Sequence, residues 1–343
     1  MEAFEHGGNV WAHPGAIDFS ASLNPLGMPS TAREALAAGI DACMRYPDPA
    51  CTALTAAIAD AWGVAAAHVL ACAGATDALG RIAQVLRPRQ VLLPTPAYVG
   101  YAEAFARFGT EVLSFALDEA DDFALTGAFV EAVRKTEADL VLVANPNNPT
   151  GRLVAPDLIE EVLDVAAARA LTVVVDECFC GLTGAAGSAT LLEAHPNLVL
   201  VGALTKSHAL AGLRVGHLMC ADASLLNRLR AAGPPWAVSV PAQLAGVAAL
   251  ADKGFLAASV EAIARQRERL VQGLSRLGVR VIPSDANFVL FRTRPGLAAD
   301  LAEHNILIRC CANFSGLDET WYRAAVRTEQ ENDLLLEAIG EVL

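Results

Sequence analysis

Short β-branched runs alternate with amphipathic stretches of helical length between Thr76 and Val238, and this alternation limits the possible folds more than any other feature of the sequence. The runs are VLL at Val91, LVLVAN from Leu140, LTVVVDE from Leu171, LVLVGAL from Leu198 and VGHLMC from Val215. Strands that alternate with helices form a mostly parallel sheet with helices on both faces. The sequence therefore predicts an α/β fold with a mostly parallel central sheet.

A second pattern begins after a long helix predicted for Leu256 to Leu277. The short segments VRVIPS, NFVLFRT, ILIRCC and YRAAVRT follow it, with helical stretches between them. A chain of 343 residues is longer than one hydrophobic core usually organises. We expect a large domain (residues 36–245), a small α+β domain (246–343), and an N-terminal segment (1–35) associated with the small domain.

The charge balance excludes several classes of partner. Lys and Arg total 25 against 38 Asp and Glu, which gives a net charge of −13, and no run of basic residues interrupts this acidity. We therefore expect no nucleic-acid partner. No apolar stretch reaches 18 residues, so we expect no membrane partner and a cytoplasmic protein. The cysteines and histidines show no CxxC or HExxH spacing, so we predict no metal site.

Unusual polar residues follow three of the predicted strands, at the edge where α/β sheets bind ligands. One strand ends in Asp176-Glu177, and taken alone these carboxylates are better explained as a cap of the following helix. Another runs into the string NPNNPTG at 145–151, which is longer than one turn needs. A third is followed by Lys206, which lies between two apolar segments. Burial there would lower the pKa of its amine and make it a usable nucleophile.

An anion site is predicted where AGATD precedes a helical run. Gly74, Ala75 and Thr76 would leave backbone N–H groups free to hold a phosphate at the positive end of the helix dipole. The guanidinium of Arg214 and the hydroxyl of Thr205 would complete this site. The motif is weak on its own, because many helices begin in this way.

Taken together and in this order, AGATD, PTPAY, NPNNPTG, the DE after a strand and TKSHALAGLR resemble the fold-type I pyridoxal-phosphate enzymes of the class I/II aminotransferase superfamily. The resemblance implies pyridoxal 5'-phosphate as cofactor and the large domain as its binding domain. Lys206 would bind the cofactor covalently and move protons, and Asp176 would pair with the pyridinium nitrogen. The remaining cofactor contacts that the resemblance implies are Asn148 to the phenolic oxygen, Tyr98 on the ring face, and Gly74, Ala75, Thr76, Thr205 and Arg214 around the phosphate.

Two positions depart from the family pattern. The family usually has a tyrosine three residues after the aspartate, and this chain has Phe179. Many relatives have a hydroxyl residue three positions before the lysine, and this chain has Ala203. Each departure removes a hydrogen-bond donor to the cofactor, so we expect somewhat looser cofactor binding.

The two ends of the chain narrow the resemblance to the threonine-phosphate decarboxylases of the cobalamin pathway. The matching segments are HGGN from His6, DFSASLNPLG from Asp18, RYPD from Arg45, IRCCANFSGLD from Ile308 and YRAAVRT from Tyr322. Arg323 would bind the α-carboxylate of a small phosphorylated amino acid, and Arg309 its phosphate. His6, Asn24 and Asn148 would make further substrate contacts. Tyr46 would reach the cofactor phosphate of the partner in a homodimer with shared active sites.

The resemblance thus implies decarboxylation of L-threonine O-3-phosphate to (R)-1-amino-2-propanol O-2-phosphate. Histidinol-phosphate aminotransferase is the alternative, because it shares the fold, the cofactor and a phosphorylated substrate. A non-catalytic cofactor-sensing domain is disfavoured by the complete set of motifs. For single residues the plain interpretations stay open: His6 as part of a terminal tail, and Arg309 as a surface charge.

Overall fold

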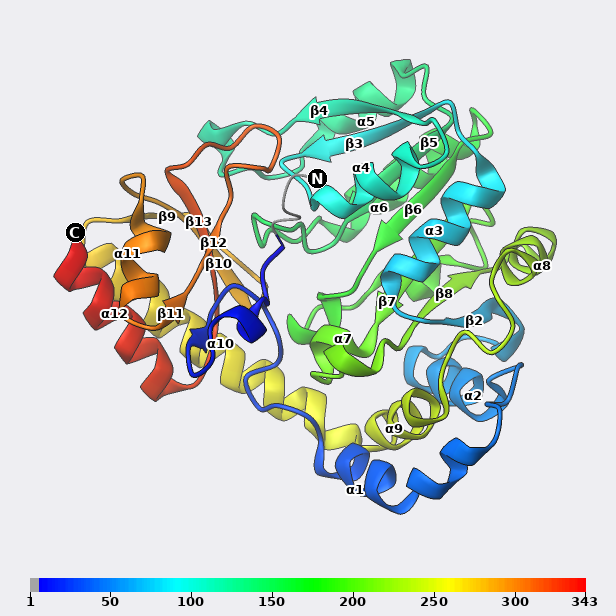
Figure 1. The fold of residues 1–343 in the computed structure, drawn as a ribbon. Coiled ribbons are helices and arrows are strands. Elements are labelled where there is room, and N and C mark those ends of the chain that lie inside the picture. Colours follow the sequence, from blue (N-terminus) through cyan, green and yellow to red (C-terminus); the bar gives the residue numbers. More distant parts are fainter. Residues whose placement is uncertain (1–5) are drawn as a thin grey trace.

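The computed structural model describes residues 6–343 and is built around a seven-stranded mixed sheet (Figure 1). The spatial order of the strands is β2 (Val69–Cys72), β8 (Gly216–Cys220), β7 (Leu198–Ala203), β6 (Thr172–Asp176), β5 (Leu140–Ala144), β3 (Gln90–Thr95) and β4 (Glu111–Ala116). Strand β8 is antiparallel to both neighbours, and the strands from β7 to β4 are parallel. The predicted α/β fold with a mostly parallel sheet is confirmed.

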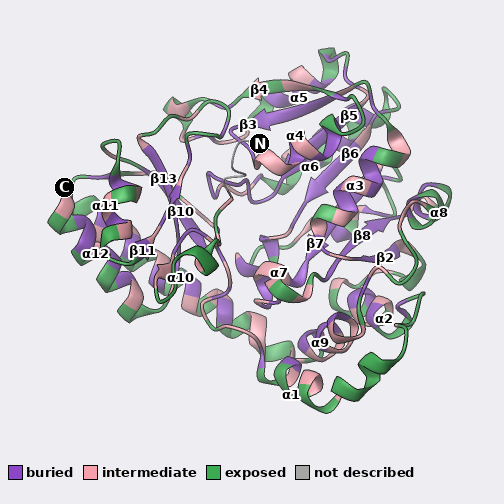
Figure 2. Ribbon diagram, viewed as in Figure 1, coloured by how far each residue is buried: buried purple, intermediate pink, exposed green. Residues whose placement is uncertain are grey.

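The inner strands of this sheet are apolar at nearly every position because both of their faces are covered. Val173 and Val175 pack into one core, whereas Val174 between them packs into the other, as the two-residue period of a strand requires. Helices α2, α5, α6 and α9 contribute to the first core, and α3, α4 and α8 to the second. Figure 2 shows the sheet buried between these layers. The helices of this part of the chain are α1 (Ser30–Ala38), α2 (Thr52–Trp62), α3 (Ala75–Leu86), α4 (Val99–Ala106), α5 (Gly127–Lys135), α6 (Pro156–Ala167), α7 (Leu204–Ser207), α8 (Ala223–Ala232) and α9 (Val240–Ala251).

A second, antiparallel sheet lies in the C-terminal part of the chain. Its order is β12 (Arg309–Cys310), β13 (Trp321–Ala325), β10 (Phe288–Arg292) and β9 (Arg280–Val281). Helices α10 (Lys253–Arg276), α11 (Leu297–Glu303) and α12 (Glu329–Val342) share an apolar core with it. The long helix predicted for 256–277 is therefore present as α10, beginning three residues earlier.

The N-terminal segment contacts both parts of the structure. Strand β1 (Ile17–Asp18) pairs in parallel with β11 (Ile306–Leu307), and Phe19 is fully buried in the C-terminal core. Helix α1 packs instead against α9. These contacts link residues 17–38 to the small domain and also to the large one, and the predicted boundaries at 35/36 and 245/246 stay predictions.

Two strands of the central sheet, β2 and β4, were not among the predicted runs. The β4 sequence EVLSFA has only intermediate and exposed positions, as fits the edge of the sheet, so it lacks the continuous apolar signal of the inner strands. Within residues 6–343, no helix has both the length and the apolar character needed to cross a membrane.

Candidate active site

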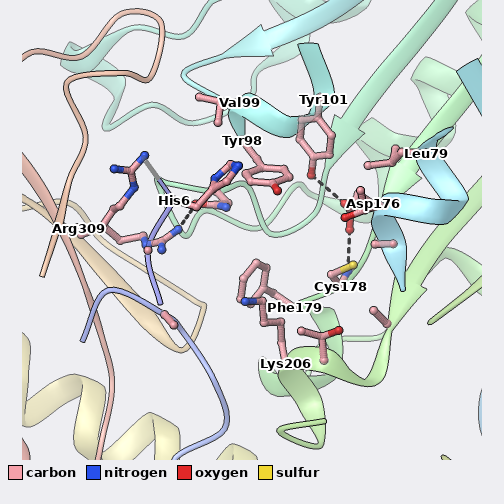
Figure 3. Close-up of a pocket in the computed structure, with 18 of the residues that line it drawn as sticks. His6, Leu79, Tyr98, Val99, Tyr101, Asp176, Cys178, Phe179, Lys206 and Arg309 are labelled. Carbon is pink, nitrogen blue, oxygen red and sulfur yellow. Dashed lines mark hydrogen bonds between the residues drawn. The ribbon is translucent and has the colours of Figure 1, made fainter. Parts of the chain in front are cut away.

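A cavity of about 250 Å³ lies at the carboxyl ends of the central strands, where the sequence predicted a site. Asp176 ends β6, and Tyr98, Asn148 and Lys206 follow β3, β5 and β7. Residues of the C-terminal sheet and of the N-terminal segment close the other side (Figure 3). The predicted site residues that line the cavity are His6, Ala75, Thr76, Tyr98, Asn148, Asp176, Thr205, Lys206, Arg214, Arg309 and Arg323.

The carboxylate of Asp176 is fixed by two donors. Its Oδ1 accepts the backbone N–H of Cys178 at 2.9 Å, and its Oδ2 accepts the hydroxyl of Tyr101 at 2.9 Å. Burial raises the pKa of Asp176, and these hydrogen bonds oppose that shift. A positively charged group placed against this carboxylate would stabilise the ionised form of Asp176. In that form Asp176 can pair with a pyridinium nitrogen.

Lys206 lies on α7, the one-turn helix that follows β7. Burial, together with the positive charges of Arg323 and Arg214, lowers the pKa of its amine to about 8. Its Nζ is 5.7 Å from the centre of the Phe179 ring. A lysine with this pKa has a substantial neutral fraction near neutral pH, so its amine is available as a nucleophile.

An anion cradle is formed at the start of α3. The first N–H groups of a helix have no partner within it and carry the positive end of its dipole. Gly74 precedes this helix with φ of +85°, and a Cβ built there would lie 2.7 Å from Nη2 of Arg214. Glycine is therefore required both by the backbone conformation and by the approach of the guanidinium. Thr205 adds its hydroxyl from the cavity wall.

Two buried arginines face the cavity from neighbouring strands. Arg309 on β12 and Arg323 on β13 are direct cross-strand partners, and they are 7% and 8% exposed. Like charges opposite each other destabilise a sheet. Burial lowers the pKa of Arg323 to about 10, with a smaller contribution from Arg309 in the same direction. Both arginines lie in the cavity wall, so an anionic ligand bound there would offset the repulsion between their positive charges.

The arginine contacts also orient Asn148. Arg323 donates from Nη1 to Asn148 Oδ1 at 2.5 Å and from Nη2 to the carbonyl of Ser20 at 2.7 Å. Since the amide oxygen of Asn148 faces the guanidinium, its NH₂ group is the part that can donate to a ligand oxygen. Arg309 donates to Asn313 at 2.6 Å and lies 5.4 Å from the centre of the Phe314 ring.

The N-terminal segment reaches the cavity through its two glycines. A Cβ at Gly7 would lie 2.4 Å from the carbonyl oxygen of Ser20, and the N–H of Gly8 donates to Ser20 Oγ at 2.8 Å. This close approach holds His6 with its ring centre 5.8 Å from that of Tyr98 and its Nε2 3.9 Å from Glu103 (Figure 3). Burial lowers the pKa of His6, and Arg309 acts in the same direction.

Three of the predicted residues do not line this cavity: Asn24, Tyr46 and Gly74. Asn24 is 3% exposed, and its amide donates to the carbonyl of Ser207 and to Ser259 Oγ, next to the Lys206 turn. Its predicted contact with substrate stays a prediction. Tyr46 is 79% exposed and stacks on Trp236 with ring centres 4.5 Å apart. Its predicted contact with a partner chain stays a prediction. Gly74 precedes α3 and lies against Arg214, which does line the cavity.

Other residues at the site were not predicted. Tyr101, Cys178, Ser20, Ala21 and Phe314 line the cavity together with the two departures, Phe179 and Ala203. Tyr101 lies three residues after Tyr98, one helical turn along, and this spacing was the available signal. Its contact with Asp176 joins residues 75 positions apart, so local sequence does not reveal it.

These groups match the chemistry of pyridoxal phosphate. Asp176 suits the ring nitrogen, Asn148 the phenolic oxygen, Tyr98 the ring face and Lys206 the aldehyde carbon. The α3 N-terminus with Arg214 and Thr205 suits the phosphate. The residues present therefore fit the cofactor that the resemblance implies, and the Gly74 cradle shows this most directly, because a side chain there would displace the arginine.

Comparison with known proteins supports this interpretation. The family model "Aminotransferase class I and II" matches residues 14–339. Threonine-phosphate decarboxylase of Salmonella typhimurium is 35% identical over 95% of this chain and 91% of its own length. Histidinol-phosphate aminotransferase 1 of Dechloromonas aromatica is 34% identical over 95% of this chain and 90% of its own length.

A solved structure of a similar protein contains the cofactor. The histidinol-phosphate aminotransferase of Sinorhizobium meliloti in complex with pyridoxal-5'-phosphate superposes with a TM-score of 0.81 at 25% identity, covering 94% of this chain and 89% of that one. With the donor set of the cavity, these matches confirm pyridoxal 5'-phosphate as the predicted cofactor. The chain belongs to the class I and II aminotransferase family.

Proposed function

We propose that this protein is a pyridoxal-phosphate-dependent carboxy-lyase that converts L-threonine O-3-phosphate to (R)-1-amino-2-propanol O-2-phosphate in cobalamin biosynthesis. The observation that carries this proposal is the cross-strand pair of buried arginines, Arg309 and Arg323. A ligand with a carboxylate and a phosphate would compensate both charges. The 35% identity to the Salmonella typhimurium threonine-phosphate decarboxylase supports the same substrate.

Each residue has a distinct part in the proposed reaction. Bound pyridoxal phosphate supplies an electron-accepting ring that stabilises negative charge at the substrate Cα. Asp176 keeps a proton on the ring nitrogen through its fixed carboxylate. Arg323 binds the substrate carboxylate, and Arg309 with His6 binds the phosphate. When the Cα–carboxyl bond breaks, CO₂ leaves, the electron pair stays at Cα, and Lys206 Nζ donates a proton there.

The bond that breaks is the one aligned with the π system of the ring. Arg309 and Arg323 hold the two ends of the substrate and so set the rotation about its Cα–N bond. An orientation that favours loss of the carboxylate would release CO₂. An orientation that leaves the Cα proton facing Lys206 would lead to transamination instead. The second candidate is therefore histidinol-phosphate aminotransferase, favoured by the 34% identical relative from Dechloromonas aromatica.

The deciding experiment offers both substrates to the purified protein. With threonine phosphate we expect CO₂ release in step with formation of a primary amine and without an oxo acid. Turnover of threonine phosphate without CO₂, or efficient amino exchange between histidinol phosphate and 2-oxoglutarate, would replace the decarboxylase by the aminotransferase.

We also propose that the active form is a homodimer in which Tyr46 reaches the cofactor phosphate of the partner. Ile40, Met44 and Tyr46 are 64%, 84% and 79% exposed, and Trp236 stacks on Tyr46. Apolar side chains clustered on a surface in this way are typical of an interface. Sedimentation should give a dimer, and the Tyr46→Ala variant should lose cofactor faster than the wild type. A monomer with full activity at high dilution would contradict this proposal.

A further inference from the structure

Asn24 occupies a position that the proposed reaction does not yet explain. Its side chain is buried, and all of its polar atoms have partners within the protein. Its backbone N–H donates to the carbonyl of Lys206 at 3.1 Å. Its amide nitrogen donates to the carbonyl of Ser207 at 2.7 Å and to Ser259 Oγ at 2.8 Å, and its amide oxygen accepts the N–H of Leu26 at 3.0 Å.

The two carbonyls that Asn24 contacts are the last ones of α7, the turn that carries Lys206. The Lys206 carbonyl also accepts the N–H of Ala209 at 3.4 Å, so the side chain of Asn24 acts mainly on the Ser207 carbonyl. The final carbonyls of a helix have no partner within it, and buried carbonyls without a partner are rarely tolerated. Water cannot readily replace Asn24 as the donor to these carbonyls, since Ser207 and the following His208 are only 7% and 1% exposed. Asn24 therefore caps this turn from 183 positions away in the sequence.

The same side chain ties the turn to α10. Ser259, which accepts from the Asn24 amide, donates in turn to the carbonyl of Phe255 at 2.7 Å. Asn24 thus joins the N-terminal segment, the lysine turn and the long helix of the small domain. These contacts fix the peptide groups on the C-terminal side of the Lys206 Cα, from which the lysine side chain extends into the cavity.

We propose that Asn24 is a positioning residue that holds the Lys206 turn in the orientation needed for the lysine amine to meet the cofactor. This inference rests on the proposed role of Lys206. It assigns to Asn24 a structural link to the lysine in place of the substrate contact that the sequence suggested. A displacement of about 1 Å at a reacting group can lower a rate by about 100-fold, so this link bears directly on catalysis.

The test is Asn24→Leu in the cofactor-loaded protein, because leucine keeps the size of the side chain and removes both amide donors. We expect cofactor release to be about 10-fold faster and the visible circular dichroism of the bound cofactor to change. We also expect kcat for threonine phosphate to fall by about 10- to 100-fold while KM stays within about threefold. A raised KM with unchanged dichroism and release would restore the substrate contact and overturn the proposal.

A matched control is Asn197→Leu. The amide of Asn197 also donates to two backbone carbonyls, those of Leu163 and Leu171, at 3.2 and 3.3 Å, but away from the cavity. This variant should lower thermal stability and leave the dichroism and cofactor release unchanged. If it changes them as much as Asn24→Leu does, the effect is general destabilisation and the proposal is wrong.

Ser259→Ala covers the case in which Asn24→Leu does not fold. It removes one partner of the Asn24 amide and should change cofactor release and dichroism in the same direction by a smaller factor of about two to five. If Ser259→Ala changes neither cofactor release nor the dichroism, the proposal is wrong. Dichroism and release need no substrate, so they report on Asn24 even if threonine phosphate is not turned over. The Lys206→Ala variant tests the lysine assignment separately, by loss of the covalent linkage to the cofactor.

Discussion

Replacing Lys206 with methionine should make the cofactor-free protein more stable at neutral pH. The amine has a pKa of about 8 in the folded protein, against an ordinary value of 10.5, because burial disfavours its charged form. That difference corresponds to a cost of about 3 kcal/mol for folding with the protonated lysine. Methionine has a similar linear shape and no charge, so the variant avoids this cost.

The pH dependence of the effect gives the sharper test. Because the pKa is lower in the folded state, the unfolded chain binds more protons between pH 8 and 10.5, and the stability of the wild type rises with pH there. The cost of about 3 kcal/mol is therefore fully present below pH 8 and is gone above 10.5. The advantage of Lys206→Met should fall to about 1–2 kcal/mol by pH 9.5.

Urea unfolding of both cofactor-free proteins between pH 6.5 and 9.5, followed by far-ultraviolet circular dichroism, measures this difference. Lys253→Met is the control, because Lys253 is exposed and pairs with Asp60 at the surface. Its substitution should change the free energy of unfolding by less than about 1 kcal/mol. A Lys206→Met protein no more stable than wild type at pH 7, or equally stabilised at pH 9.5, would refute the reasoning.

Three further predictions concern the reaction and the cofactor. Arg309→Ala should raise KM for threonine phosphate by about 100-fold or more, since charge-assisted hydrogen bonds contribute about 1.5–3 kcal/mol each. It should change the kinetics with plain threonine far less, and equal losses on both substrates in steady-state assays would indicate a structural role. The Asp176→Asn variant should still bind the cofactor, as measured by absorbance. Its kcat should be lower by on the order of 100-fold, because a neutral partner no longer keeps the ring nitrogen protonated. An unchanged kcat would remove Asp176 from the mechanism. Phe179→Tyr should slow the release of the cofactor, because the added hydroxyl supplies the donor that the family usually has, and should change stability by less than about 1.5 kcal/mol. Faster release on dialysis would show that the ring position cannot accommodate a hydroxyl.

The sequence determined the inner strands of the large sheet and the residues that follow them. A buried parallel strand must be apolar at successive positions, so LVLVA at β5 and TVVVD at β6 are visible as local patterns. The end of each run then identifies Asn148, Asp176 and Lys206, because ligands bind at that edge of the sheet. Both signals depend on a few neighbouring residues.

The tertiary structure alone decided which polar groups meet. The contact of Tyr101 with Asp176 and the position of the Asn24 amide under the lysine turn join residues 75 and 183 positions apart. The direction of β8 and the pairing of Arg309 with Arg323 depend on how whole strands pack. Burial of apolar side chains favours a periodic pattern that many arrangements satisfy, whereas a hydrogen bond needs two atoms within about 3 Å. That condition is met only after the helices and strands have packed together.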